Sequence, residues 1–214
     1  FGFSVAIDGE RIIVGSPQRD WFGAIADGGV AHIYEWNAGL GTWPHRSTFT
    51  ANVASVDAWF GYAVDISGDW VLVGAPGEAT WRGTVYPARL VPGSIVPYGP
   101  IRAVDGTAWD SFGEAVGIDG HDFAVGAPDD DDLGVNSGSV YRFEYQGPVW
   151  REIEKLNASD GTGSDWFGQA VAIDGDLIAV GAPGRDDTGA DSGSAYVFRD
   201  AGASWTESRD RDLQ

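Results

Sequence analysis

The chain has 214 residues and a formal net charge of −19, from 32 Asp and Glu against 13 Lys and Arg. So strong a negative charge disfavours nucleic acid and anionic membrane surfaces as partners, because both are themselves negative. The sequence contains no Cys, which removes disulfides and thiol chemistry from consideration. It also lacks an apolar run long enough for a membrane-spanning helix, so we expect no membrane insertion.

A segment that opens with Phe-Gly and closes with Gly-Ala-Pro or Gly-Ser-Pro occurs four times, without insertion or deletion. The copies begin at Phe1, Phe60, Phe112 and Phe167, and their closing glycines are Gly15, Gly74, Gly126 and Gly181. A period of roughly 50 to 60 residues is that of a supersecondary unit in a propeller, a solenoid or another repeat array. The core is therefore expected to be divided among similar units.

Each copy predicts two antiparallel strands. Two short runs rich in Val, Ile and Ala flank a dipeptide that favours a tight turn, and these dipeptides are Asp8-Gly9, Ser67-Gly68, Asp119-Gly120 and Asp174-Gly175. Gly supplies the positive φ that two-residue hairpin turns need. Both strands are apolar at nearly every position, which predicts that both faces of the sheet are covered.

Two further strands follow each hairpin. In chain order they are expected at residues 29–36 and 46–50, at 84–91 and 94–102, at 138–143 and from Trp150, and at 193–198 and from Trp205. Four-stranded units at this period predict an all-β fold, a β-propeller built of four four-stranded antiparallel blades. The blades divide the chain at about residues 1–59, 60–111, 112–166 and 167–214.

The second repeat is the irregular one. Its later half contains Pro87, Pro92, Pro97 and Pro100. Proline cannot donate to a strand ladder and so indicates a sheet edge. We therefore predict that the third and fourth strands of this repeat are the outer, solvent-facing strands of their blade.

The repeated Phe-Gly, together with Gly-Ala-Pro at residues 74–76, 126–128 and 181–183, resembles the FG-GAP family. These are the repeats of the integrin α-chain propeller and of many secreted microbial proteins, and the resemblance covers the whole chain. It implies a non-catalytic, integrin-like module for cell adhesion or binding. One feature departs from the integrin type, whose calcium loop D-x-[DN]-x-D-G-x-x-D is replaced here by the two-residue turn. Such a turn cannot surround calcium with six or more oxygens.

Acidic residues gather instead in the loops that follow the third and fourth Gly-Ala-Pro. The candidate metal ligands are Asp130, Asp131, Asp132 and Asn136 in the third repeat and Asp186, Asp187 and Asp191 in the fourth. Carboxylate and amide oxygens in a tight loop are what a hard cation requires, so Ca²⁺ is the cofactor we expect at such a site. The alternative is structural, because Asp side chains also cap turns and keep loops soluble.

Three tryptophans, Trp59, Trp109 and Trp166, lie in the links between repeats. In a four-stranded meander these links emerge on the same face as the acidic loops. Aromatic faces stack on sugar rings, which makes the three residues candidates for ligand binding. Because they recur with the repeat, the alternative is that they wedge between neighbouring blades.

No catalytic motif is present: the sequence has no G-x-S-x-G and no H-E-x-x-H, and its three His residues fall at unlike positions. We therefore expect a non-catalytic module for adhesion or structural assembly, extracellular or at the cell surface, with a protein or glycan partner. A lectin-like carbohydrate binder and an accessory domain of a secreted enzyme are the alternatives. Asn157 begins a glycosylation sequon at a surface link.

The last expectation concerns closure. The first strand of the chain is the innermost of one blade and the last strand is the outermost of another, so no strand remains to complete a blade across the join. We expect the four repeats to belong to a larger array rather than to close alone. The missing blades would come from further portions of the chain or from neighbouring copies in an oligomer or fibre. The ends of such an arc would expose apolar faces, and large apolar patches mark interfaces.

Overall fold

A computed structural model describes residues 1–20, 25–51, 55–186, 189, 192–202 and 204–208. Within these residues the chain forms 16 β-strands and one short helical turn, α1 (Glu78–Trp81). The strands make four four-stranded antiparallel sheets, so the all-β prediction is confirmed. None of the helical structure described is long and apolar enough to cross a membrane.

Each sheet is a meander whose strands follow chain order. The first sheet has β1 (Val5–Asp8), β2 (Arg11–Ser16), β3 (Val30–Glu35) and β4 (His45–Phe49). The second has β5 (Val64–Ser67), β6 (Trp70–Ala75), β7 (Thr84–Val91) and β8 (Ser94–Pro97). The third has β9 (Ala115–Asp119), β10 (Asp122–Ala127), β11 (Ser139–Tyr145) and β12 (Trp150–Leu156). The fourth has β13 (Ala170–Asp174), β14 (Leu177–Ala182), β15 (Ser194–Asp200) and β16 (Trp205–Glu207).

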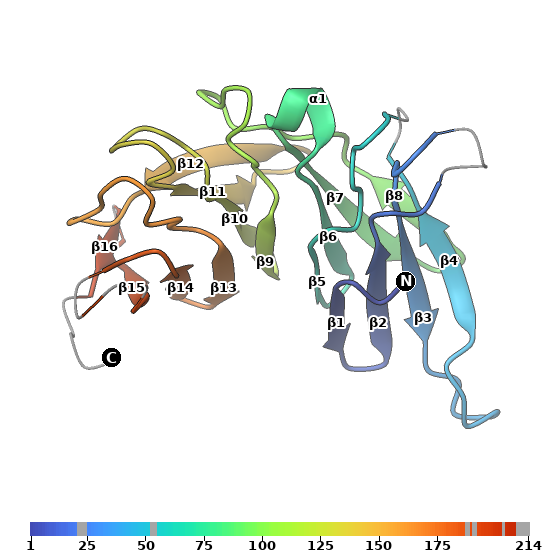
Figure 1. The fold of residues 1–214 in the computed structure, drawn as a ribbon. Coiled ribbons are helices and arrows are strands. Elements are labelled where there is room, and N and C mark those ends of the chain that lie inside the picture. Colours follow the sequence, from blue (N-terminus) through green and yellow to red (C-terminus); the bar gives the residue numbers. More distant parts are fainter. Residues whose placement is uncertain (21–24, 52–54, 187–188, 190–191, 203, 209–214) are drawn as a thin grey trace.

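The four sheets follow one another around an arc, with the first and fourth sheets at its two ends (Figure 1). Their innermost strands are neighbours in chain order: β1 lies beside β5, β5 beside β9, and β9 beside β13. The described strands form no sheet that joins the two ends. The four sheets therefore form an open arc.

The hairpin turns lie one residue later than expected. Asp174 is the last residue of β13 and pairs with Leu177, so the two turn residues are Gly175 and Asp176. Gly175 has a φ of 53°, and a two-residue turn with Gly at its first central position needs positive φ only there. Asp8 and Asp119 likewise end their strands instead of entering the turn.

The residue before each turn glycine connects neighbouring sheets through a contact that we call the turn bond. Three turn bonds occur: Gly68 N donates to Asp8 Oδ2 at 2.6 Å, Gly120 N to Ser67 Oγ at 3.0 Å, and Gly175 N to Asp119 Oδ2 at 2.8 Å. In each one the acceptor belongs to one sheet and the donor to the next. The side chain that sequence patterns assign to a turn thus stabilises the contact between sheets.

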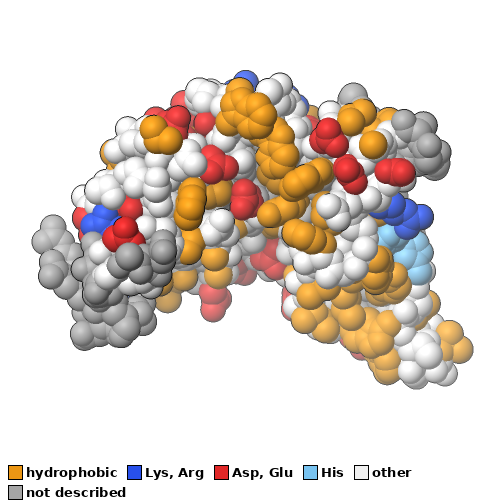
Figure 2. All heavy atoms as spheres, viewed as in Figure 1, with side chains coloured by type: hydrophobic (Ala, Val, Ile, Leu, Met, Phe, Trp, Pro, Cys, Tyr) orange, Lys and Arg blue, Asp and Glu red, His pale blue; other side chains and the backbone are white. Residues whose placement is uncertain are grey.

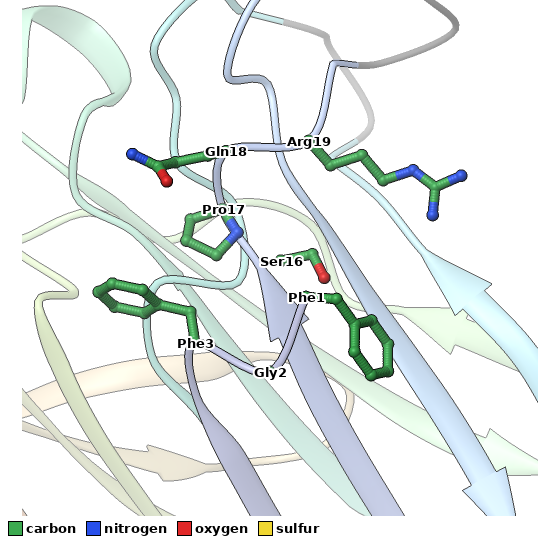
Figure 3. A pocket seen from close by; sticks show the side chains of 7 residues that line it. All are labelled: Phe1, Gly2, Phe3, Ser16, Pro17, Gln18 and Arg19. Atoms are coloured by element: carbon green, nitrogen blue, oxygen red, sulfur yellow. The ribbon is translucent and has the colours of Figure 1, made fainter.

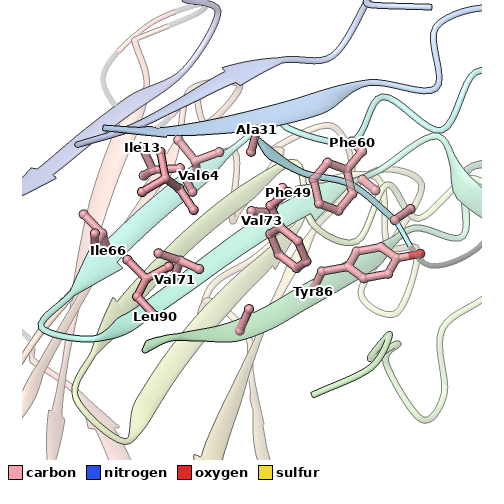
Figure 4. Packing of buried hydrophobic residues seen from close by; sticks show 14 residues of the cluster. Ile13, Ala31, Phe49, Phe60, Val64, Ile66, Val71, Val73, Tyr86 and Leu90 are labelled. Carbon is pink, nitrogen blue, oxygen red and sulfur yellow. The ribbon is translucent and has the colours of Figure 1, made fainter. Parts of the chain in front are cut away.

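Apolar clusters fill the spaces between neighbouring sheets. In the first cluster, Ile13 and Ala31 of the first sheet pack against Phe60, Val71 and Val73 of the second (Figure 4). All five side chains are fully buried. Burying one Ile, Val or Phe side chain stabilises the fold by about 1.5–3 kcal/mol. Because these side chains are buried between sheets, the core is divided among the interfaces between neighbouring sheets, as the repeat pattern predicts.

Neighbouring sheets approach each other at backbone distance along the repeat glycines. A Cβ added to the closing glycine of one repeat would collide with the carbonyl oxygen of the opening Phe-Gly of the next. The pairs in contact are Gly15 with Gly61, Gly74 with Gly113, and Gly126 with Gly168. The opening Phe also bridges to the glycine before the third strand of the preceding sheet, as Phe60 does with Gly29. The closing glycine of one repeat and the opening Phe-Gly of the next repeat therefore form a single contact between neighbouring sheets.

One strand expectation needs correction. β8 is the edge strand, but β7 pairs with both β6 and β8 and is largely buried. Pro87 O accepts a hydrogen bond from Tyr98 N, so the Pro87 nitrogen faces the same outer side of β7. Pairing on that side breaks between Pro97 and Ile101. Proline fits in an interior strand here because no partner strand requires a donor at that point.

The expectation that both faces are covered holds for the middle sheets only. The β5 and β9 strands are largely buried between neighbours, whereas β1 and β13 are largely exposed. The difference follows from position, because the first and fourth sheets each have a neighbour on one side.

Candidate functional site

The links between sheets and the loops between second and third strands share one face, which we call the loop face. Backbone hydrogen bonds join each link to the loop of the preceding sheet: Trp59 N to Asp27 O at 3.0 Å, Ser111 N to Trp81 O at 2.8 Å, and Trp166 N to Asn136 O at 3.1 Å. The prediction that both kinds of connection emerge together is confirmed.

The three candidate ligand-binding tryptophans stand on constrained backbone. Trp59, Trp109 and Trp166 have φ values of 55°, 77° and 53°. Bulky residues rarely adopt this left-handed region, and such conformations persist where surrounding contacts fix them. Backbone hydrogen bonds from the three tryptophan amides to loop carbonyls supply those contacts, so the fold fixes the backbone at each tryptophan.

Five aromatic rings form a continuous series across the first three sheets, which we call the aromatic row: Phe3, Tyr62, Trp59, Trp81 and Trp109. Successive ring centroids are 4.8, 5.7, 4.7 and 6.5 Å apart. The Tyr62 and Trp59 rings are nearly parallel, at 12°, as are those of Trp81 and Trp109, at 10°. Aromatic pairs at such distances attract one another by about 0.5–1.5 kcal/mol, so the row is a preorganised surface.

The aromatic row is most exposed at its two ends. Trp109 is 62% exposed and Phe3 is 58% exposed, while the three rings between them are half-buried. Figure 2 shows apolar side chains continuing from beside α1 down the arc toward β5 and β1. The Trp59 indole nitrogen is buried and has no hydrogen-bond partner among the described residues. The row therefore offers a broad apolar contact surface.

The structure brings together two of the three predicted tryptophans. Trp59 and Trp109 are joined through Trp81, whereas Trp166 lies against Gly184 and makes no ring contact within the described part of the chain. Sequence reasoning missed Trp81 because its loop, residues 76–83, has no counterpart in the other repeats. The shortness of this loop is the sequence feature that could have predicted the contact, because a short loop keeps Trp81 close to the link that contains Trp109.

Asp130 is the buried centre of the acidic loop in the third repeat. Its carboxylate accepts hydrogen bonds from Ser139 Oγ and Tyr141 Oη, each at 3.0 Å, and from Asp132 N at 3.1 Å. Lys155 Nζ lies 3.0 Å away as a counter-ion. A buried carboxylate requires this kind of pairing, and here protein groups supply it.

Lys155 places its ammonium group where three carboxylates converge. Its Nζ is 3.0 Å from Asp105 Oδ2, 3.0 Å from Asp130 Oδ2 and 2.5 Å from Asp132 Oδ2. Burial alone would lower the pKa of Lys155, but hydrogen bonds to these carboxylates raise it above its ordinary value. Burial would raise the pKa of Asp105, and hydrogen bonds from Lys155 and Tyr141 lower it instead. The ammonium group thus holds the position that a cation would take.

The remaining candidate ligands divide into three groups. Asp131 Oδ1 accepts a hydrogen bond from Asn136 N at 2.8 Å and so stabilises the turn. Asp186 is exposed, and Asp187 and Asp191 lie outside the described residues. Among described residues no three or more His, Cys, Asp or Glu side chains are grouped to hold a metal ion. Calcium binding stays a prediction.

The fourth sheet also has a basic residue beside link carboxylates. Arg185 lies 3.3 Å from Asp160 and 3.2 Å from Asp165. Tyr196 Oη donates to Asp160 at 2.9 Å, and the Tyr141 hydroxyl, which has one proton to donate, lies 2.9 Å from Asp105 and 3.0 Å from Asp130. In both sheets a link carboxylate is thus neutralised by a cation of the protein and held by the tyrosine of the third strand.

The fold defines the class of this protein: an all-β repeat protein whose four-stranded sheets are joined through Phe-Gly and Gly-Ala-Pro segments. The family model of the FG-GAP repeat matches residues 43–86, 99–143 and 150–198, together more than half of the chain. The chain belongs to the FG-GAP repeat family. A search of curated proteins returned no match. FG-GAP repeats suggest an integrin-like propeller module, are generally non-catalytic and are typical of extracellular proteins.

Proposed function

We propose that this chain is a non-catalytic module for adhesion or structural assembly, at the cell surface or outside the cell, and that it binds its partner through the aromatic row. The observation that carries the proposal is the row itself, five rings in contact across three sheets with both ends more than half exposed. Aromatic side chains are favoured anchors in binding surfaces because they bury a large area at little cost in conformational entropy.

The chemistry of the partner follows from the surroundings of the row. The chain carries a net charge of −19, which repels anionic partners and favours neutral or basic ones. A protein with an exposed apolar segment and an uncharged glycan both meet this requirement.

Carbohydrate recognition is the second candidate, and the exposure of Trp109 favours it. The Trp109 ring ends the row and is nearly parallel to Trp81, so it presents a flat apolar face to solvent. The C–H groups of a sugar ring can stack on such a face, while hydroxyl groups on the sugar's edge find acceptors in an acidic protein.

Binding of the chain to an array that carries both neutral glycans and extracellular proteins tests the proposal. Trp109→Ala removes the exposed end of the row, and Trp166→Ala is the matched control, since it changes another link tryptophan with positive φ outside the row. We expect about tenfold weaker binding for Trp109→Ala, which corresponds to roughly 1.4 kcal/mol, and unchanged binding for Trp166→Ala.

The array also separates the two candidates. Saturable binding to defined sugars would assign the lectin function, and saturable binding to proteins alone would assign adhesion or assembly. Absence of binding to every spot, or equal losses in the two variants, would contradict a role for the aromatic row.

A further inference from the structure

Four rings of the aromatic row lie in the middle of the arc. Trp59 and Tyr62 precede β5, Trp81 ends α1, and Trp109 lies in the link before β9. The second sheet that carries the first three rings is packed on both sides, because β5 contacts β1 and β9. The fifth ring, Phe3, precedes β1 and lines the cavity shown in Figure 3. The surface of the four middle rings is therefore a product of packing between neighbouring sheets.

The loop that carries Trp81 has a strained backbone. Ala79, Thr80 and Trp81 are left-handed, with φ values of 54°, 62° and 61°. This conformation is unfavourable for L-residues because it brings Cβ too close to the following carbonyl oxygen. Two hydrogen bonds from the next link hold the turn: Trp109 N donates to Thr80 O at 3.2 Å, and Ser111 N donates to Trp81 O at 2.8 Å. The fold thus fixes the backbone at Trp81 at a cost in local strain.

Trp109 occupies a link position where the other links carry small polar residues. The residue three before the opening Phe is Asp57, Trp109 or Ser164 in successive links, with φ values of 56°, 77° and 67°. Short polar side chains tolerate this left-handed backbone, whereas bulky ones rarely adopt it. Trp109 is 62% exposed, and Trp81 is its only ring contact among the described residues. Because strained residues cluster at binding sites, this exposed indole is better explained by a ligand than by packing.

The four rings form two plates that meet at a steep angle. The Tyr62 and Trp59 rings lie within 12° of parallel, as do those of Trp81 and Trp109 within 10°, but the Trp59 and Trp81 rings are inclined by 78°. A flat ligand can lie on one plate only. A polyproline II helix has three residues per turn and so presents apolar faces in several directions. It rises about 3.1 Å per residue, so one step of 4.7–6.5 Å between successive rings spans about two of its residues.

The polar atoms of these rings suit a ligand that carries hydrogen-bond acceptors. An indole N–H group only donates, and those of Trp81 and Trp109 are not buried and make no hydrogen bond within the described part of the chain. Burial and the nearby Glu114 carboxylate raise the pKa of Tyr62, so its hydroxyl stays protonated and can donate as well. A polyproline II helix has no internal hydrogen bonds, and proline has no N–H. Its backbone therefore offers unpaired carbonyl oxygens and no competing donors.

We infer that the partner of the aromatic row is a proline-rich protein segment in the polyproline II conformation. The inference rests on the proposed function, since it names the ligand of the same surface. A polyproline II helix is already formed before it binds, so it loses little conformational entropy. A proline tract is also uncharged, so the net charge of −19 does not oppose it. Acidic segments are disfavoured, because Glu114 lies beside Tyr62 and Asp129 accepts a hydrogen bond from Ser111 Oγ at 2.7 Å.

Isothermal titration calorimetry of the chain with decaproline tests this inference. The peptide is acetylated and amidated, so that it carries no terminal charge. A Gly-Ser peptide of the same length is the control ligand, because it is a flexible coil with the same number of backbone carbonyls. We expect saturable binding of decaproline and at least about tenfold weaker binding of the Gly-Ser peptide. Equal affinities for the two peptides would overturn the inference, since the row would then not select the polyproline II conformation.

Trp109→Asn tests the site itself. Asn tolerates left-handed backbone, so this variant should keep the thermal midpoint of the parent chain or exceed it, while decaproline binds about tenfold more weakly. Trp166→Asn is the matched control, because it makes the same change at another link residue with positive φ, outside the aromatic row. It should bind decaproline as the parent does. A lowered midpoint for Trp109→Asn would show that Trp109 serves packing and would overturn the argument from strain.

A titration with a neutral oligosaccharide separates this inference from the proposed function. If Trp109→Asn weakens binding of the sugar and decaproline does not bind, the row is a binding surface but its ligand is a glycan, and the inference is wrong. If decaproline binds equally well to the parent and to Trp109→Asn, the peptide site lies elsewhere and the inference is again wrong. If no ligand of the parent chain, on the protein and glycan array or in solution, is weakened by Trp109→Asn, the proposed function fails together with the inference.

Discussion

Gly126→Ala tests whether the repeat glycines set the stability of the arc. The new Cβ would collide with Gly168 O, and Gly168 Cα would lie 3.3 Å away. Relief requires the third and fourth sheets to separate locally by about an ångström, and a gap of that size forfeits a quarter to a half of the dispersion attraction across it. The interface contains fully buried Ala124 and Phe167 and Ile178. Overpacking typically lowers the free energy of unfolding by about 1–3 kcal/mol. We expect Gly126→Ala to lie near the upper end of this range, because the atoms that collide with the new Cβ are backbone atoms that cannot rotate away.

Gly181→Ala is the matched control for Gly126→Ala. Both are closing glycines in strands without positive φ, but only Gly126 faces a following Phe-Gly in the arc. Thermal unfolding would be followed by circular dichroism at a protein concentration where the chain is monomeric. A loss of about 3 kcal/mol lowers the midpoint by roughly 6–12 °C for a chain of this length, and we expect Gly181→Ala to stay within about 1 kcal/mol of the parent. Equal midpoints for the two variants would refute the assignment of these glycines to contacts between sheets.

Three further predictions address the turn bonds, a buried carboxylate and the acidic loop. Asp119→Ala removes a turn bond and should lower the free energy of unfolding in urea by about 1 kcal/mol, whereas Asp174→Ala should leave the monomer unchanged; equal losses would contradict the turn bond. Burial raises the pKa of Asp65 more than its bonds from Ile118 N and Ile66 N lower it, so the folded state binds the proton more readily and stability falls as pH rises above 3.8 through the raised pKa. Asp65→Asn should therefore flatten the dependence of the thermal midpoint on pH in that range, and a slope equal to the parent's would oppose this assignment. Lys155→Met leaves the buried carboxylate of Asp130 without its counter-ion and should destabilise the fold by about 3 kcal/mol, while the exposed carboxylates of Asp105 and Asp132 add little because solvent screens them. Millimolar Ca²⁺ should restore part of that loss by binding the folded state, and no recovery would count against calcium in this loop.

The strands could be predicted from the sequence because their signals are local. Apolar β-branched runs and tight-turn glycines marked every hairpin, and the predicted 84–91 strand coincides with β7. The errors arose where a neighbouring strand or sheet decides the outcome. Pro87 is interior because pairing breaks opposite its nitrogen, and Asp174 ends its strand because the turn begins at Gly175.

The candidate site was less predictable because it depends on contacts between distant segments. Trp81 joins Trp59 to Trp109 only once the second and third sheets are packed together. Lys155 reaches the acidic loop because it is the cross-strand partner of Tyr141, a register that spacing along the chain does not reveal. The number of carboxylates along the chain therefore predicted a metal site, which stays a prediction, but it did not predict that an ammonium group lies beside Asp130 and Asp132.

The family repeat in this sequence spans the contact between two neighbouring sheets and does not coincide with one sheet. The family matches at 43–86 and 150–198 each begin with the outer strand of one sheet and end within the third strand of the next. The opening Phe-Gly of a repeat packs against the closing glycine of the repeat before it. The closing glycine must lack a side chain because a Cβ would collide with the carbonyl oxygen of the next Phe-Gly. The burial of Phe60 between the first and second sheets and the burial of Ala124 between the third and fourth sheets thus have one physical origin, because both belong to the contact that the arc makes three times.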